Sequence, residues 1–332
     1  MTFDDLRERL GLSERLQPQA AIEVTASIDD DFEGSFVVGT RGSALAQTQT
    51  QWVIERLRSP RVKFETRIIK TVGDQQLDVA IVAIGDKGVF VKEIEDALLR
   101  GDIDLAVHSL KDLPTEIPPG LCLAAIPPRE DPRDVLVLNQ AAHHSQFTIG
   151  TSSLRRRAQL LNLCEELSVV DLRGNVDTRI RKLREQGLAG IVLAAAGLRR
   201  LGRFEADGWL LPYEVMLPAP GQGALAIEGR ADDARTCELV AALDDRASRR
   251  CVLAERALLH RLQGGCNVPV GALARQRPHG MMLLEGVIAT PDGKTLIRRE
   301  ATGSNPERLG VTVAEMLLEH GGDEILRALR SP

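Results

Sequence analysis

The stretch 262–271 reads LQGGCNVPVG and follows an amphipathic run. Gly264 and Gly265 can adopt the left-handed backbone that ends a helix, and Pro269 prevents the helix from resuming. Cys266 is therefore expected on a fixed loop just past a helix, where a thiol can be displayed to a cleft. We interpret this sulfur as the attachment point of a covalently bound group, on which the other functional segments converge.

The composition limits the classes of function. A chain of 332 residues exceeds what one hydrophobic core usually serves, so two or three domains are expected. Aromatic residues make up only 3%, which argues against a platform for stacking nucleic-acid bases. The formal charge of −5 also argues against a polyanion partner, and no apolar run approaches the length of a membrane span. We therefore predict neither a nucleic-acid nor a membrane partner.

The cysteines indicate a reducing compartment. There are five, an odd number, and none lies in a CxxC pair. A disulfide framework or a zinc site is therefore not expected, and we predict a cytoplasmic protein without a metal. Cys266 differs from the other four in its glycine-rich surroundings, whereas the others lie in apolar patterns typical of core thiols.

The first 34 residues form an acidic extension. They hold nine acidic residues and three arginines, a local charge of −6, which leaves the remainder at +1. The segment lacks the apolar core of a secretory signal. We interpret it as mostly disordered or weakly helical.

From residue 35 the chain alternates strands and helices, which indicates an α/β fold. Two segments rich in proline and glycine, 127–134 and 217–223, interrupt the pattern and are candidate hinges. The segment 73–88 has weak periodicity and glycine at both ends, so it is a candidate mobile loop. A third unit begins near residue 245.

One pattern occurs three times: a strand ends, arginine and a small capping residue appear, and a helix starts. A helix start is electropositive and leaves amide hydrogens unpaired, so arginine there predicts a carboxylate or phosphate site. The alternative for each arginine is a pair with a neighbouring acid, or solvent. The arginines and their small neighbours are Arg41 with Ser43, Arg155 and Arg156 with Ser152 and Ser153, and Arg173 with Asn175, with Arg179 one turn further on.

Lys111 and Asp112 come just past a strand end. A carboxylate beside cations stays ionised and could hold a substrate N–H group or a developing cation. The alternative is a turn aspartate that accepts backbone hydrogen bonds.

These residues lie within eight motifs that resemble the porphobilinogen deaminase, or hydroxymethylbilane synthase, family. The resemblance runs in collinear order from residue 36 to the C-terminus and leaves out the acidic extension. The motifs are VGTRGSALA (38–46), GDKGVFVKEIE (85–95), AVHSLKDLP (106–114), EDPRD (130–134), GTSSLRRRAQL (150–160), LRGNVDTRI (172–180), LPAPGQGALAIE (217–228) and LQGGCNVPVG (262–271).

The resemblance implies an α/β fold of two periplasmic-binding-protein-like domains, each a mixed sheet flanked by helices, and a smaller α/β C-terminal domain. It places residues 35–128 and 222–242 in a discontinuous first domain, 129–221 in the second, and 243–332 in the third, which carries the cofactor cysteine. Residues 1–34 stay outside as the extension.

The resemblance also implies the activity of a transferase in tetrapyrrole (haem) biosynthesis. Members of the family condense four porphobilinogen molecules, with loss of ammonia, onto a covalent dipyrromethane and release hydroxymethylbilane by hydrolysis. The dipyrromethane is bound through a thioether to the cysteine that matches Cys266. A monomer is implied.

By the same resemblance, Asp112 is the catalytic residue. Porphobilinogen carries two carboxylates, which suit bidentate guanidinium groups. The sequence departs from the family at Ala83 and Asp86 in the loop, which bears on its contacts. The implied cofactor-binding residues are Cys266, Lys111, Arg155, Arg156, Ser153, Thr151, Arg173 and Gly197, and the implied substrate-binding residues are Arg41, Ser43, Arg173, Arg179, Lys87 and Phe90.

Two other functions fit part of the pattern. A noncatalytic carboxylate-binding protein of the periplasmic-binding fold would use the same arginines reversibly, but it gives no reason for a displayed Cys266 or for Asp112 among cations. A cysteine-nucleophile hydrolase would need a histidine partner near Cys266, and the sequence offers no clear one.

Overall fold

The computed structural model describes residues 2–18, 24, 32–71, 91–141, 147–204, 207–263 and 268–330. The chain divides into two compact units, each built from discontinuous segments. One unit comprises Met1–Gln19, Asp131–Gln222 and Cys251–Pro332, and the other comprises Ala20–Glu130 and Gly223–Arg250. The finer division into three domains stays a prediction.

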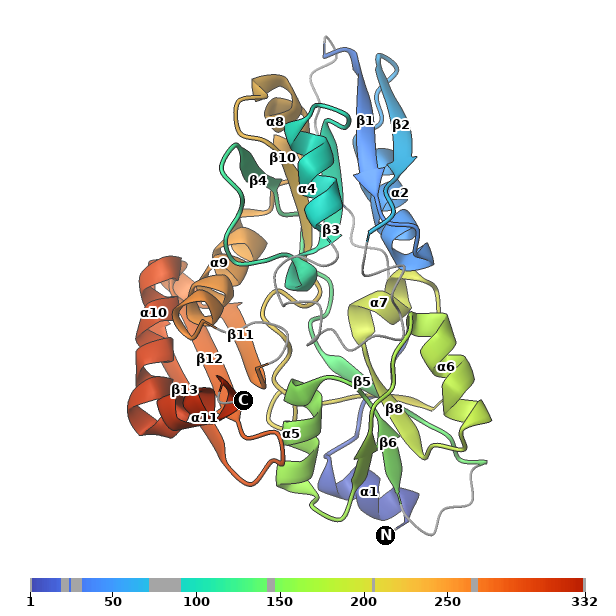
Figure 1. Ribbon diagram of the computed structural model, residues 1–332, viewed down its shortest axis with the longest axis vertical. Helices are drawn as coiled ribbons and strands as arrows, with labels where there is room; N and C mark the ends of the chain where they lie inside the picture. Colours follow the sequence, from blue (N-terminus) through green and yellow to red (C-terminus); the bar gives the residue numbers. More distant parts are fainter. Residues whose placement is uncertain are drawn as a thin grey trace. The chain divides into compact units, whose positions relative to one another are not determined.

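The second of these units contains a five-stranded mixed sheet in the order β2-β1-β3-β10-β4 (Figure 1). The strands β1, β2 and β3 are parallel, and β10 runs antiparallel to both β3 and β4. The apolar side chains of β1 alternate, so that Phe36 and Val38 pack with α2 and α8 while Val37 packs toward α4. The bounds are β1 Gly34–Thr40, α2 Ala44–Arg56, β2 Val62–Ile68, α4 Lys92–Leu99, β3 Leu105–Ser109, β4 Leu121–Ala125, β10 Leu225–Arg230 and α8 Ala234–Ala241.

The other unit contains a second five-stranded mixed sheet, in the order β7-β6-β8-β5-β9. Its directions repeat those of the first sheet, because β6, β7 and β8 are parallel while β5 runs antiparallel to β8 and β9. The bounds are α1 Phe3–Arg9, β5 Asp134–Leu138, β6 Thr148–Gly150, α5 Leu154–Leu163, β7 Ser168–Val170, α6 Val176–Glu185, β8 Gly190–Ala194, α7 Ala195–Arg200 and β9 Gly208–Leu210.

Helices cover both faces of this second sheet. Every residue of β5 is buried, as expected of a strand that lies between two helical layers. Leu136 and Leu138 face α1 and α5, whereas Val135 and Val137 face α6 and α7. The β5 strand therefore reads as a continuous apolar run rather than an alternating one.

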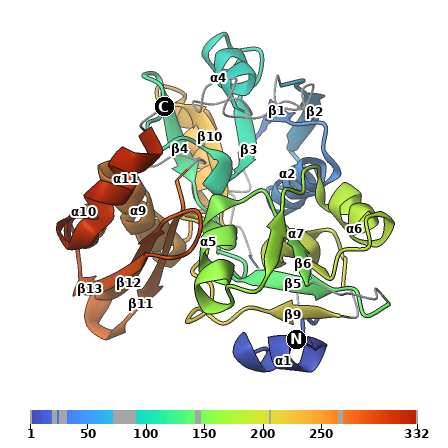
Figure 2. The same ribbon diagram turned by 60° about the horizontal axis from the view of Figure 1, so that its bottom comes forward.

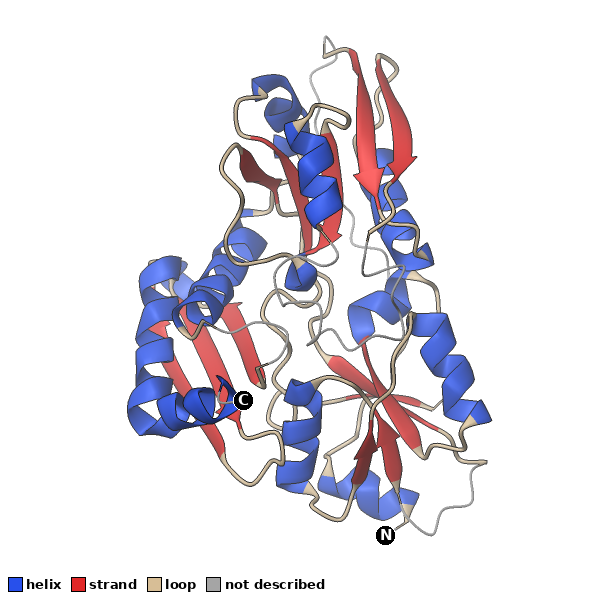
Figure 3. Ribbon diagram, in the orientation of Figure 1, coloured by secondary structure: helices blue, strands red, loops and turns tan. Residues whose placement is uncertain are grey.

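The C-terminal part of the same unit is a three-stranded antiparallel sheet in the order β11-β12-β13, with helices packed on it (Figure 3). Leu258 of α9 and Val313 of α10 are fully buried against Leu284 of β12. The bounds are α9 Arg246–Arg261, β11 Val270–Gln276, η3 Pro278–Gly280, β12 Met282–Ala289, β13 Leu296–Gly303, α10 Pro306–Leu317, η4 Leu318–Gly322 and α11 Asp323–Arg330. The predicted fold class, two mixed sheets with helices and a smaller α/β C-terminal domain, is confirmed.

Of the two alternatives predicted for the N-terminal extension, mostly disordered or weakly helical, the helical one describes its first part. Residues 3–9 form α1, and Leu6 and Leu10 are fully buried in the core of the second sheet. Figure 2 shows α1 beside β9. The acidic residues dominated the composition, but leucines four residues apart share one helix face and can bury together. Residues 19–23 and 25–31 lie outside the described residues.

Across the described part of the chain, no helix combines the length and the apolar character that crossing a bilayer requires.

Candidate active site

The first sheet brings four predicted residues to one edge. The strands β1 and β3 are adjacent and parallel, so the residues that follow their carboxyl ends gather there. Arg41 follows β1, and Ser43 caps α2 by accepting a hydrogen bond from the backbone N–H of Ala46 over 3.3 Å. Lys111 and Asp112 follow β3.

The turn that carries Asp112 is held by its neighbours. Leu110 and Leu113 are buried on either side, and the backbone N–H of Leu110 donates to the carbonyl of Ala224 over 3.0 Å. Asp112 itself is exposed, and Lys111 is half-buried. The buried leucines act as anchors, so a fixed turn presents an ionisable carboxylate outward.

A buried polar cluster lies on β3, the strand that leads into this turn, and on its neighbour β10. Nε2 of His108 lies 3.0 Å from a carboxylate oxygen of Glu228, and both side chains are at most 3% exposed, but the two groups form no hydrogen bond with each other. Burial, together with the negative charge of Glu228, raises the pKa of Glu95 to about 7, although His108 opposes the shift. Since β3 carries both His108 and the Asp112 turn, this cluster borders the predicted catalytic segment.

The second sheet gathers the other predicted residues in the same way. The strands β6, β7 and β8 are parallel, so the starts of α5, α6 and α7 lie at one edge of the sheet. Asp134 also lies at this edge, because β5 is antiparallel and pairs Asp134 with Ala194, the last residue of β8.

Arg155 and Arg156, in the first turn of α5, both pair with Asp134. Nη1 of Arg155 donates to Oδ2 over 2.7 Å, and Nη2 of Arg156 donates to Oδ1 over 2.7 Å. All three side chains are buried. The alternative of a neighbouring acid thus describes these two arginines. Two guanidinium charges against one carboxylate still leave a net charge of +1, which can attract a further anion.

The ionised form of Asp134 is stabilised by this arrangement. Burial alone would raise the pKa of Asp134, but the charges and hydrogen bonds of Arg155 and Arg156 hold it below its ordinary value. Nη1 of Arg155 also donates to the carbonyl of Leu217 over 2.7 Å, and Nη1 of Arg156 donates to the carbonyl of Val192 over 2.8 Å. Backbone carbonyls as well as the Asp134 carboxylate therefore hold the two guanidinium groups in place.

The turn before α6 carries the next two predicted residues. Arg173 and Arg179 are half-buried, and Nε of Arg179 donates to the carbonyl of Gly174 over 2.8 Å. Gly174 has a φ of +123°, which favours glycine, and a Cβ there would clash with Thr178. Asn175 caps α6 by accepting from the N–H of Thr178 over 2.9 Å, as predicted.

Three smaller residues complete this edge. Ser153 caps α5 by accepting from the N–H of Arg156 over 3.4 Å. Thr151 is buried, and its hydroxyl accepts from the N–H of Ser153 over 3.2 Å. Gly197 is buried inside α7.

Three predicted residues, Cys266, Lys87 and Phe90, and the segment 73–88 lie outside the described residues. The part of the LQGGC prediction that the structure describes is confirmed, because α9 ends at Arg261 and β11 begins at Val270. Gln263 has a φ of +49°, in the left-handed region expected after a helix.

Sequence reasoning missed the partners that hold the arginines. Asp134 was visible only as the last residue of EDPRD, and Gln222 only as part of GQG. The buried amide of Gln222 donates to Oδ1 of Asp134 over 3.0 Å and to the carbonyl of Pro132 over 2.7 Å. A charged residue at the start of an otherwise apolar strand was the available signal for Asp134, since a charge there is buried only if it is paired.

Comparison with known proteins identifies the family. Residues 36–238 match the family model described as "Porphobilinogen deaminase, dipyromethane cofactor binding domain", and residues 249–319 match "Porphobilinogen deaminase, C-terminal domain". The chain is 50% identical over 301 residues to the porphobilinogen deaminase of Pelotomaculum thermopropionicum, covering 88% of this chain and 96% of that protein. It is 50% identical over 303 residues to that of Desulforudis audaxviator, covering 89% and 98%.

Solved structures give a weaker likeness. A putative methionine-binding lipoprotein from Bacillus subtilis is 11% identical, with a TM-score of 0.37 over 64% of this chain and 92% of that one. The fold assignment therefore rests on the sheet orders described above.

By its two mixed sheets, each with helices that start where parallel strands end, this chain is an α/β protein. It belongs to the porphobilinogen deaminase family. The resemblance found in the sequence is thereby confirmed, together with the predicted transferase activity and the dipyrromethane cofactor that the family model names.

Proposed function

We propose that this chain condenses four porphobilinogen molecules stepwise, with loss of ammonia, and releases hydroxymethylbilane by hydrolysis. The observation that carries the proposal is the identity of about one half with porphobilinogen deaminases over nearly their whole length. We further propose that the protein acts in the cytoplasm as a monomer.

Cys266 is the proposed attachment site of the dipyrromethane, through a thioether. It lies in the short connection between α9 and β11, so both of its ends are fixed by buried residues, Leu262 and Val270. When bound, the cofactor supplies a pyrrole end that accepts the first substrate unit.

The carboxylates of the dipyrromethane fit the end of the second sheet where the parallel strands β6, β7 and β8 finish. The buried arrangement of Arg155, Arg156 and Asp134 keeps one positive charge in excess, and Arg173 stands at the next strand end along the same edge. With Lys111, Thr151, Ser153 and Gly197, these residues are the proposed cofactor contacts. The proposed substrate-binding residues are Arg41, Ser43, Arg173, Arg179, Lys87 and Phe90.

Asp112 is the proposed catalytic residue. Loss of ammonia from the aminomethyl group of porphobilinogen leaves a cation, and an ionised carboxylate on a fixed turn stabilises it as the charge develops. Its exposure beside buried Leu110 and Leu113 allows contact with a substrate N–H group without movement of the backbone.

The test replaces Asp112 by alanine. Turnover of porphobilinogen should fall by about 10²–10³-fold, the range found when one preorganised electrostatic group is removed from an active site. The control is Asp102→Asn, an exposed carboxylate paired with Arg100 in the same unit, which should leave turnover unchanged. Carboxylate binding without any turnover in the unaltered protein would instead support the noncatalytic alternative.

A further inference from the structure

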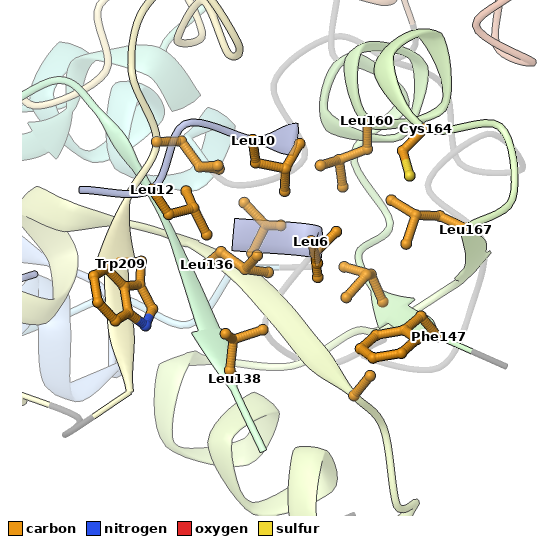
Figure 4. Packing of buried hydrophobic residues seen from close by; sticks show 14 of the residues in the cluster. Leu6, Leu10, Leu12, Leu136, Leu138, Phe147, Leu160, Cys164, Leu167 and Trp209 are labelled. Atoms are coloured by element: carbon orange, nitrogen blue, oxygen red, sulfur yellow. The ribbon is translucent and has the colours of Figure 1, made fainter. Parts of the chain in front are cut away.

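The N-terminal segment is built into the core of the second sheet. Leu6 and Leu10 are fully buried and pack with Leu136 of β5 and Leu160 of α5 (Figure 4). The helix is closed at its start by Thr2, whose hydroxyl accepts from the N–H of Asp5 over 3.1 Å while the Asp5 carboxylate accepts from the N–H of Thr2 over 2.6 Å. A seven-residue helix alone is marginal in water, so its leucines hold it in place.

The residues after α1 extend the sheet at its β9 edge. The N–H of Leu210 donates to the carbonyl of Glu14 over 2.8 Å, and the N–H of Leu16 donates to the carbonyl of Gly208 over 2.9 Å. This short antiparallel bridge satisfies backbone groups that an edge strand otherwise exposes.

Two arginines of the segment enclose the Trp209 ring of β9. The guanidinium carbons of Arg7 and Arg15 lie 4.0 and 4.5 Å from the ring centroid. Both distances are within the range of cation–π attraction. The segment thus contacts both the backbone of β9 and its Trp209 side chain.

Glu14 connects the segment to the start of β5. Its carboxylate accepts from Nη1 and Nη2 of Arg133 over 2.6 and 3.1 Å, a bidentate pair. Arg133 also donates from Nη2 to Asp131 over 2.8 Å, and its carbonyl accepts from the N–H of Ala195 over 3.0 Å. The next residue is Asp134, whose carbonyl accepts from the N–H of Leu211 over 2.9 Å.

We propose that residues 2–16 form a brace that positions Asp134, and through it the Arg155 and Arg156 pair, for carboxylate binding. Two sets of contacts connect the brace to Asp134. The brace pairs with β9, and Leu211, which follows β9, donates its N–H to the carbonyl of Asp134. Glu14 also pairs with Arg133, the residue before Asp134. It lies outside the matched family region, which begins at residue 36. The part of the inference that concerns cofactor carboxylates rests on the proposed function.

Leu10→Ala in the full chain tests the packing. Truncation of a fully buried leucine should lower the unfolding temperature by roughly 5–15 °C. The control is Glu8→Gln, an exposed residue of the same helix, which should shift it by less than about 2 °C. An unchanged unfolding temperature in Leu10→Ala would overturn the proposal.

Glu14→Gln tests the positioning, measured by hydrogen exchange. The amides of Ala195 and Leu211, which bond to the carbonyls of Arg133 and Asp134, should exchange about three to five times faster, while amides of β1 and β2 stay unchanged. A merely structural role would leave these two amides as they are in Glu8→Gln, and that result would also overturn the proposal.

The fraction of purified protein that carries the dipyrromethane, read by intact mass, should be lower in Glu14→Gln than in Glu8→Gln; equal fractions would overturn the link to the cofactor. If no protein, the unaltered one included, carries the group, then the proposed function fails. The hydrogen-exchange and unfolding measurements test the structural role of the brace independently of that outcome.

Discussion

Nη1 of Arg155 lies 2.7 Å from Oδ2 of Asp134, and both side chains are buried. A predicted ligand-binding arginine is thus preorganised by an acid of its own compact unit. The pairing fixes the direction of the guanidinium group, and the second arginine on the same carboxylate, Arg156, preserves the positive charge that a ligand needs.

Removal of this acid should therefore damage the fold and the site together. Asp134→Ala leaves two buried guanidinium groups without their partner, which should destabilise the protein by about 3–5 kcal/mol. Urea unfolding measures the change. Asp177→Asn is the matched control, because its pair with Arg203 is about half exposed and should contribute at most about 1 kcal/mol. Equal effects of the two substitutions would contradict the role assigned to Asp134.

The pKa of Glu95, raised to about 7 by burial and by Glu228, predicts a pH dependence of stability. As the pH rises from about 4.5 to about 7, the unfolded chain loses this proton while the folded chain keeps it, so stability should fall across that window. Glu95→Gln removes this ionisable carboxyl group. Between pH 4 and pH 8 the free energy of unfolding of the variant should therefore rise by about 3 kcal/mol relative to that of the unaltered protein.

Urea unfolding at several pH values between these limits checks this prediction. His108, Glu228 and Asp96 face or neighbour Glu95 and remain in the variant, so the substitution removes one carboxyl group and leaves its charged neighbours present. Glu55→Gln, an exposed residue of α2, should keep the pH profile of the unaltered protein. A profile of Glu95→Gln that runs parallel to that of the unaltered protein would show that Glu95 is ionised normally.

Arg173 offers a test of carboxylate recognition. Arg173→Lys keeps the charge but loses the planar fork, so kcat/KM for porphobilinogen should fall about tenfold, equivalent to roughly 1.4 kcal/mol. Arg181→Lys is the control, since Arg181 pairs with Glu185 on the exposed side of α6. Steady-state kinetics measure both, and an unaffected Arg173→Lys would remove this residue from the site.

The helix caps could be predicted from the sequence, because their position depends on local structure. Ser43, Ser153 and Asn175 cap helices as expected, because a cap is decided by a few neighbouring residues. The partnership of Asp134 with Arg155 could not be predicted, since it joins a strand start to a helix that follows 21 residues later in the chain.

The acidic extension illustrates a different limit. Its net charge favoured disorder, but Leu6 and Leu10 are decisive, and their value depends on an apolar face of the second sheet that sequence spacing alone does not reveal. Of the two residues on which the proposed chemistry depends most, Asp112 lies on its predicted turn, whereas Cys266 lies outside the described residues.

The intact mass of the purified protein tests the central claim most directly. The account predicts a mass above that of the sequence by one dipyrromethane, a pyrrole colour with acidic Ehrlich reagent, and loss of both in Cys266→Ser. A chain of bare sequence mass that stays unmodified and inactive after incubation with porphobilinogen would contradict it.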